Sequence, residues 1–174
     1  MPKVISAADF WHWSGTFYQL PDVAPSLLAW QNHCHGQVNA VLWILYLWTQ
    51  DKTLPVSAYA ELDVVITRSH AEDVGPIREL RMQTAKDDPQ YRTLLQAELS
   101  AEQRQQALLV EQTLPHVVDG AEDITNALTV YLEWHTARHL TAAQQTEVQA
   151  LLAALVTLLV NTLYTATRQV DSHD

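Results

Sequence analysis

The pair of residues best spaced for metal chemistry is His135 and His139, which lie four positions apart. On a helix this spacing puts both imidazoles on one face, where they can bind the same metal ion. No glutamate stands between them, so the zinc signature His-Glu-x-x-His is absent, and no third ligand lies within sequence reach. We therefore expect a solvent-exposed pair, no metal, no cofactor and no catalytic residue. A metal-dependent enzyme built on the pair is the third hypothesis.

Cys34 is flanked by His33 and His35, which gives three candidate ligands in a row. At a helix end, successive side chains point about 100° apart, so three neighbours seldom converge on one ion. We expect a buried Cys34 and a loop His35. Cys34 is also the only cysteine, which excludes an intramolecular disulfide and favours a cytoplasmic protein.

Gln31 and Asn39 are amides among apolar neighbours, where an unpaired amide costs about 1–3 kcal/mol. We expect Asn39 to cap the third helix and Gln31 to bond a backbone group, with ligand contact as the alternative. Arg78 and Arg81 share a helix face and could hold an anion, but internal salt bridges are the favoured interpretation.

Aromatic residues are concentrated in the first 50 positions, which hold five of the six tryptophans. Phe10, Trp13 and Phe17 form one helical stripe, and Trp11 and Tyr18 form another on a different face. A helix at the edge of a bundle buries one such stripe. We expect the Trp11–Tyr18 stripe to be partly exposed or covered by another chain.

Two hypotheses follow from this aromatic surplus. The first is a non-enzymatic interaction module that binds a protein partner or a second copy of itself, since Trp and Tyr are favoured at interfaces. The second is a binder of a small apolar ligand or cofactor, with a pocket between the first three helices lined by Trp13, Phe17, Trp30 and Trp43. The predicted binding residues are Trp11, Trp13, Phe17, Tyr18, Trp30, Gln31, His35 and Asn39.

Composition excludes several other classes. The 174 residues carry 10 Lys and Arg against 20 Asp and Glu, and a net charge of −10 is the wrong sign for nucleic acid. Four glycines argue against glycine-rich phosphate loops. The most apolar stretch, residues 151–163, is shorter than the ~20 residues of a membrane span, so we expect a buried helix and no span.

The elements that must position these residues are all helical. Prolines and glycines recur at helical spacing, which predicts a compact all-α bundle of about eight helices, one domain over residues 1–174 and no sheet. Residues 40–50 should form the central helix, because the stretch 41–48 is apolar all round. Asp22 is expected to cap the second helix and Gly36 to end it, and the β-prone residues 64–67 are assigned to a helix. The last helix should begin at a Thr141–Gln144 capping box and run to about residue 169.

The order of residues near the amino terminus resembles an uncharacterised bacterial family of small helical proteins, found mostly in proteobacteria. The likeness rests on Phe10-Trp11, Tyr18, Pro21-Asp22-Val23, Leu28, Gln31 and His35-Gly36-Gln37-Val38-Asn39. Similar motifs continue at 76–81, 98–103 and 126–132, so the resemblance covers about residues 9–155. It implies an all-helical fold and no particular activity.

Overall fold

The computed structural model describes residues 4–172 and contains eight α-helices within that range. In chain order they are α1 (Ala7–Tyr18), α2 (Val23–Cys34), α3 (Val38–Thr49), α4 (Tyr59–Ser69), α5 (Gly75–Gln83), α6 (Pro89–Thr113), α7 (Ile124–His139) and α8 (Ala142–Asp171). The all-α prediction is confirmed. One detail is wrong: β1 (Lys52–Thr53) and β2 (Val118–Asp119) pair as a short antiparallel ladder, so the chain is not free of strand.

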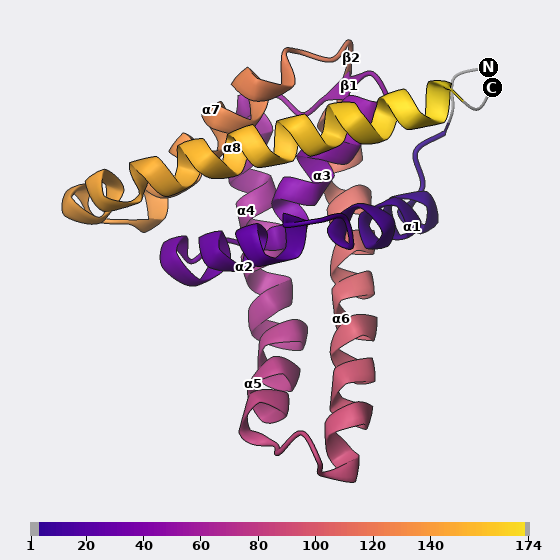
Figure 1. Cartoon of the computed structure of the whole chain (residues 1–174), viewed down its shortest axis with the longest axis vertical. Coiled ribbons are helices and arrows are strands. Elements are labelled where there is room, and N and C mark those ends of the chain that lie inside the picture. Colours follow the sequence, from indigo (N-terminus) through magenta and orange to yellow (C-terminus); the bar gives the residue numbers. More distant parts are fainter. Residues whose placement is uncertain (1–3, 173–174) are drawn as a thin grey trace.

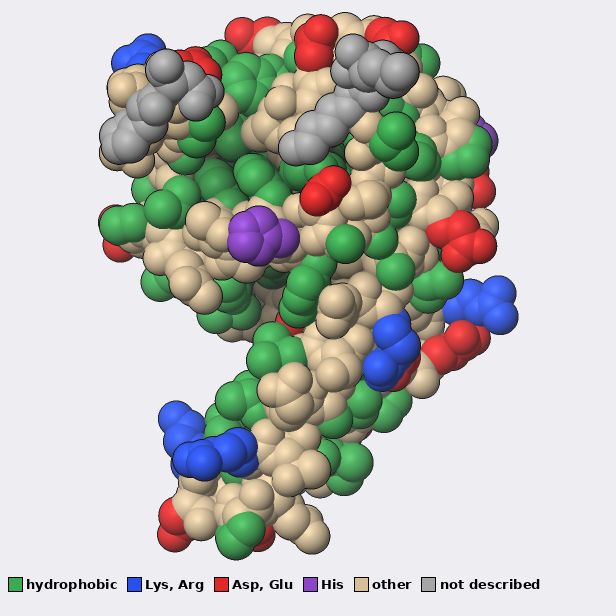
Figure 2. All heavy atoms as spheres, turned by 90° about the vertical axis from the view of Figure 1, so that its right-hand side faces the viewer, with side chains coloured by type: hydrophobic (Ala, Val, Ile, Leu, Met, Phe, Trp, Pro, Cys, Tyr) green, Lys and Arg blue, Asp and Glu red, His purple; other side chains and the backbone are tan. Residues whose placement is uncertain are grey.

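The molecule divides into a rounded body and a narrow arm (Figure 1). The arm consists of residues 75–100, that is, α5 and the first half of α6, and it extends from the body beside the lower end of α4. Figure 2 shows the same division from the side. Among residues 75–100 only the Glu98 side chain is in the buried class, whereas the body contains the apolar core.

Helix α3 is the centre of the body, as predicted. Every residue from 40 to 47 is buried, because a helix that is apolar all round needs neighbours on every side. The helix begins at Val38 after Gln37, so Asn39 lies inside the first turn. The expectation that Asn39 caps this helix is therefore wrong, and its amide is left to bond elsewhere.

The turn between α2 and α3 differs from the prediction in its left-handed residue. His35, with φ of 54°, ends α2 in place of Gly36. Gly36 is required for another reason, since a Cβ atom there would lie 2.4 Å from the Trp30 indole. Asp22 precedes α2 with φ of 65° and makes no side-chain cap, so that expectation is also wrong.

Helices α4 and α5 form one continuous helical segment joined by a π-helical turn, His70–Val74. The turn adds a residue to the helical repeat just before Pro76, which cannot supply a backbone donor. Residues 64–67 are helical as predicted. The segment carries the chain from the body into the arm.

Helix α8 completes the body. Thr141 and Gln144 form the predicted capping box of α8. By length and composition α8 passes the test for a membrane span, as core helices of other proteins also do. The expectation of a buried helix is met only on one face, because 28% of its most apolar window is buried. The structure packs α8 against α7 and α2.

Candidate functional site

A cavity of about 550 Å³ lies where the arm joins the body. Its size falls within the range of small-molecule sites. Residues from α1, α2, α3, α5 and α6 line it: Trp11, His12, Ser14, Gly15, Thr16, Tyr18, Gln19, Leu28, Gln31, Gln37, Val38, Asn39, Leu42, Arg78, Leu99, Glu102, Gln105 and Gln106.

A ladder of hydrogen-bonded amides forms part of the cavity wall. Asn39 Nδ2 donates to Gln105 Oε1 at 2.7 Å, and Gln106 Nε2 donates to Asn39 Oδ1 at 2.9 Å. The ladder is anchored at both ends, because Gln106 Nε2 also donates to Ser14 Oγ and Gln105 Nε2 donates to Ser69 Oγ. Gln106 Oε1 is buried and has no partner among the described residues. The geometry therefore holds the amides in fixed positions.

Three other amides that line the cavity make no side-chain hydrogen bond among the described residues: Gln19, which is exposed, and Gln31 and Gln37. The Gln31 and Gln37 side chains are partly buried, and neither makes a hydrogen bond to another residue in the range 4–172. Each amide group offers both a donor and an acceptor. The expectation that Gln31 bonds a backbone group is not met.

The charged edge of the cavity is already paired. Arg78 Nε donates to Glu98 Oε1 at 2.7 Å, and Arg78 Nη2 donates to Glu102 Oε1 at 2.7 Å. Burial raises the pKa of Glu102 even though Arg78 opposes the shift. Burial, followed by the nearby Glu102 charge, also raises the pKa of Tyr18. Arg81 pairs with Glu98 as well, so the predicted internal salt bridges are confirmed.

The structure brings together four of the eight predicted binding residues: Trp11, Tyr18, Gln31 and Asn39 all line the cavity. The predicted lining by Trp13, Phe17, Trp30 and Trp43 is wrong, because none of these four contributes to it. Phe17, Trp30 and Trp43 lie in the core instead, and Trp13 is partly buried against it.

The rings that do not line the cavity have other partners. Trp13 stacks on Phe17 with a centroid distance of 4.9 Å, and Trp30 and Trp43 are fully buried. No described tryptophan is in the exposed class. The surplus of tryptophan is used mainly for packing.

The sequence prediction missed Gln105 and Gln106. A signal was present: residues 98, 101, 105 and 109 recur at helical spacing, and all four are buried. Gln105 therefore occupies a core-facing position, and a polar residue at such a position needs a polar partner. Asn39 is that partner.

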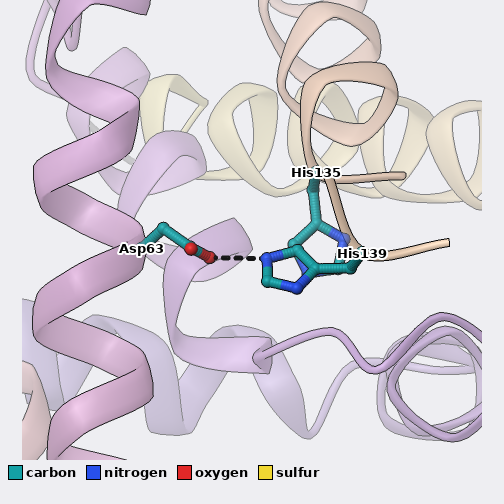
Figure 3. Close-up of side chains that lie close together, drawn as sticks. All are labelled: Asp63, His135 and His139. Carbon is teal, nitrogen blue, oxygen red and sulfur yellow. Dashed lines mark hydrogen bonds and ion pairs between the residues drawn. The ribbon is translucent and has the colours of Figure 1, made fainter. Parts of the chain in front are cut away.

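A second cluster lies in the body, away from the cavity. Asp63 of α4 and His139 of α7 are joined through Oδ1 and Nε2 at 2.9 Å, with His135 beside them (Figure 3). Arg138 Nε donates to the other Asp63 oxygen at 3.0 Å. Burial, and next the neighbouring His139 imidazole, lowers the pKa of His135 to about 4, a shift that the Asp63 charge and then the His35 backbone oppose.

The expectation of an exposed histidine pair without a third ligand is wrong. His135 is 2% exposed, and Asp63, which is 76 positions from His139 in sequence, completes a group of three. The fold places Asp63 of α4 beside the two histidines of α7, which the local sequence could not show. The other histidine prediction holds: His35 is exposed at the end of α2, and Cys34 is buried.

A family model described as "Protein of unknown function (DUF2390)" matches residues 9–109, which is more than half of the chain. The chain belongs to this family. The DUF2390 match spans α1 to most of α6 and therefore includes every residue that lines the cavity. Asp63 lies inside the matched region, whereas His135 and His139 lie beyond it. No significant match is found among curated proteins, and none among solved structures.

Proposed function

We propose that this DUF2390 protein binds one small, largely uncharged organic molecule in the cavity between the body and the arm. The supporting observation is the cavity itself: about 550 Å³ in volume, with aromatic, aliphatic and amide groups from five helices around it. A mostly apolar concave site with a few fixed polar groups is the usual form of a ligand site.

The wall chemistry specifies the class of ligand. Trp11 and Tyr18 offer aromatic surface, while Leu28 and Leu42 offer aliphatic surface. The free amides of Gln31 and Gln37 can each donate to and accept from a polar group of the ligand. A ring system that carries an amide-like edge satisfies both requirements.

The charge distribution disfavours an anionic ligand. Among residues 4–172, Arg78 is the only arginine or lysine that lines the cavity, and Glu98 and Glu102 already bind it. Releasing Arg78 would leave Glu102 without its cation and Glu98 with Arg81 alone, which costs more than a ligand contact returns. The proposed ligand is therefore neutral, and the proposed role is binding, without a catalytic step.

The test is native mass spectrometry of the full chain with a panel of neutral heteroaromatic fragments and a matched panel of carboxylates. We expect 1:1 complexes with members of the neutral panel. Trp11→Ala and Gln31→Leu should lose them, since both side chains line the cavity.

Trp13→Ala is the matched control, because it removes a tryptophan two positions away whose ring packs on Phe17 outside the cavity. Equal loss of complexes in Trp13→Ala and Trp11→Ala would reject the cavity as the site. Preference for the carboxylate panel would reject the proposed ligand class.

Protein contact through the arm is the second candidate function. Leu80, Met82 and Leu95 are 55%, 72% and 40% exposed on the arm, where Figure 2 shows hydrophobic side chains along its length. Large exposed apolar side chains on a projecting element favour a contact surface. The proposed partner is a second copy of the chain.

Sedimentation tests this second candidate. Met82→Asp should shift a dimer to a monomer, whereas Val170→Asp, which changes a residue on α8 that is 65% exposed, should leave the dimer unchanged. A wild-type protein that sediments as a monomer at all concentrations would reject self-association through the arm.

A further inference from the structure

The cluster of Asp63, His135 and His139 has the composition and spacing of a metal site. Each residue offers one ligand atom, and the three atoms all lie within 4.8 Å of one another. Helix α4 supplies the carboxylate and α7 supplies both imidazoles, whose ring centroids are 4.4 Å apart (Figure 3). None of the three lines the cavity between the body and the arm, so the cluster is a separate site.

His135 is a buried imidazole, 2% exposed, that makes no hydrogen bond to another side chain among the described residues. The ring lies between aromatic neighbours, with the Trp30 centroid at 5.3 Å and the Tyr131 centroid at 6.2 Å. An imidazole in such surroundings is neutral, which is the form that binds metal ions.

We propose that Asp63, His135 and His139 bind one divalent transition-metal ion of the zinc type, which links α4 to α7. Two imidazoles and a carboxylate suit such ions, and the two histidines stand at the helical spacing that allows shared coordination.

Only small side-chain movements are needed for the three ligand atoms to reach one ion. Zinc holds N and O ligands at about 2.0–2.2 Å, so ligand atoms around a tetrahedral ion lie about 3.4 Å apart. The cluster, with ligand atoms inside 4.8 Å, must close slightly, and the direct Asp63–His139 contact opens to admit the ion. Arg138 can keep its bond to the second Asp63 oxygen and so orient the carboxylate from behind.

The surroundings favour a structural role for the ion. Asp63 and His135 are 7% and 2% exposed, and His139 gives the only partly open side of the cluster. The site thus lacks the lining of a substrate cavity, and its effect should appear as stability. Binding to the folded state alone raises the melting temperature in proportion to the logarithm of metal concentration over Kd.

The experiment is an equilibrium titration of chelator-treated full-length protein with Zn²⁺ against a fluorescent zinc indicator. The expected result is one Zn²⁺ per chain with Kd below about 10 μM, together with a higher melting temperature in zinc. Co²⁺ should give the visible absorption of a four-coordinate site, with water as the fourth ligand. His139→Ala and Asp63→Asn should weaken zinc binding by at least about 100-fold.

His116→Ala is the matched control, because His116 also pairs with a carboxylate of α4, Glu61, on the surface. It should leave Kd unchanged within about twofold, since surface pairs contribute little. Circular dichroism of Asp63→Asn, which preserves the side-chain shape, separates lost binding from lost folding. The proposal is overturned if wild-type Kd exceeds about 10 μM, or if folded Asp63→Asn and His139→Ala bind zinc as wild type does.

Discussion

The body and the arm are held together by different forces. In the body, Phe10, Trp43 and Tyr46 pack with ring centroids 5.0–6.1 Å apart, and α3 is buried along its length. In the arm, residues 75–100, the only buried side chain is Glu98, and it bonds two arginines. Apolar burial stabilises the first region, and paired charge orders the second.

This difference explains the position of the cavity. Its walls from α1, α2 and α3 belong to the apolar body, whereas Arg78 and Leu99 belong to the arm. Packing fixes the wall on the body side, whereas ion pairs hold the wall on the arm side. Side chains of the arm can therefore shift to fit a ligand while the body wall stays in place. The following predictions test whether the two regions differ in this way.

The largest effect is expected in the body. Trp43→Ala should lower the free energy of unfolding by about 3–5 kcal/mol, because it removes a fully buried indole and leaves a cavity. It also leaves Thr113 Oγ1 without the 2.8 Å bond from the indole nitrogen. Urea unfolding measures the change. A loss below about 1 kcal/mol would show that the body is not stabilised mainly by packing.

Acid should act on the body through His135. Its folded-state pKa of about 4 lies below the ordinary 6.5, so between these values the unfolded chain binds a proton that the folded chain does not. Stability should therefore fall as pH drops from 6.5 to 4, by on the order of 3 kcal/mol from this residue.

His135→Phe is the matched variant for the acid effect. Unfolding free energies of metal-free protein, measured across this pH range, should decline less steeply in His135→Phe than in wild type. Parallel curves would contradict the assignment of the effect to His135.

The arm should respond more weakly than the body to loss of its central residue. Glu98→Gln leaves Arg78 and Arg81, each about one-fifth exposed, without the carboxylate that both bind. We expect a loss of about 1–3 kcal/mol. Glu72→Gln, which breaks the exposed Arg68 pair, should cost about 0.5 kcal/mol or less. Similar unfolding midpoints for the two variants would show that the buried pair contributes no more than a surface one.

The smallest difference is expected within α1. Trp13 packs on Phe17 and lies 5.5 Å from Tyr46 between ring centroids, whereas Trp11 faces the cavity. Trp13→Ala should therefore lower the melting temperature more than Trp11→Ala. The free energies of unfolding of the two variants should differ by about 1 kcal/mol or more. Equal losses by thermal melts would show that both stripes of α1 are core.

The sequence predicted the elements well where local signals were strong. The Thr141–Gln144 box marks a helix start that the structure reproduces, and the apolar run of α3 is buried as expected. The turn before α3 was harder to predict. Gly36 was expected to supply the left-handed residue, but His35 does so, and the glycine at position 36 is required instead by its close approach to Trp30.

The sites depend on contacts between distant residues, which local patterns do not contain. From the sequence Asn39 was expected to cap the third helix, but in the fold its side chain bonds to Gln105, 66 positions later. The His135–His139 pair looked incomplete until α4 placed Asp63 beside it. Trp11, Tyr18 and Gln31 were identifiable as unusual residues, but their convergence on one cavity required the fold.

The most direct test of ligand binding in the cavity is an NMR titration that follows the side-chain amide resonances of glutamine in the presence of a neutral heteroaromatic fragment. We predict that Gln31 and Gln37 shift in proportion to occupancy, while Gln144 and Gln145 of α8 remain unchanged, because only the first two line the cavity with free amides. Shifts confined to α8, or no shift of Gln31 and Gln37 with a fragment that binds the protein, would contradict the account.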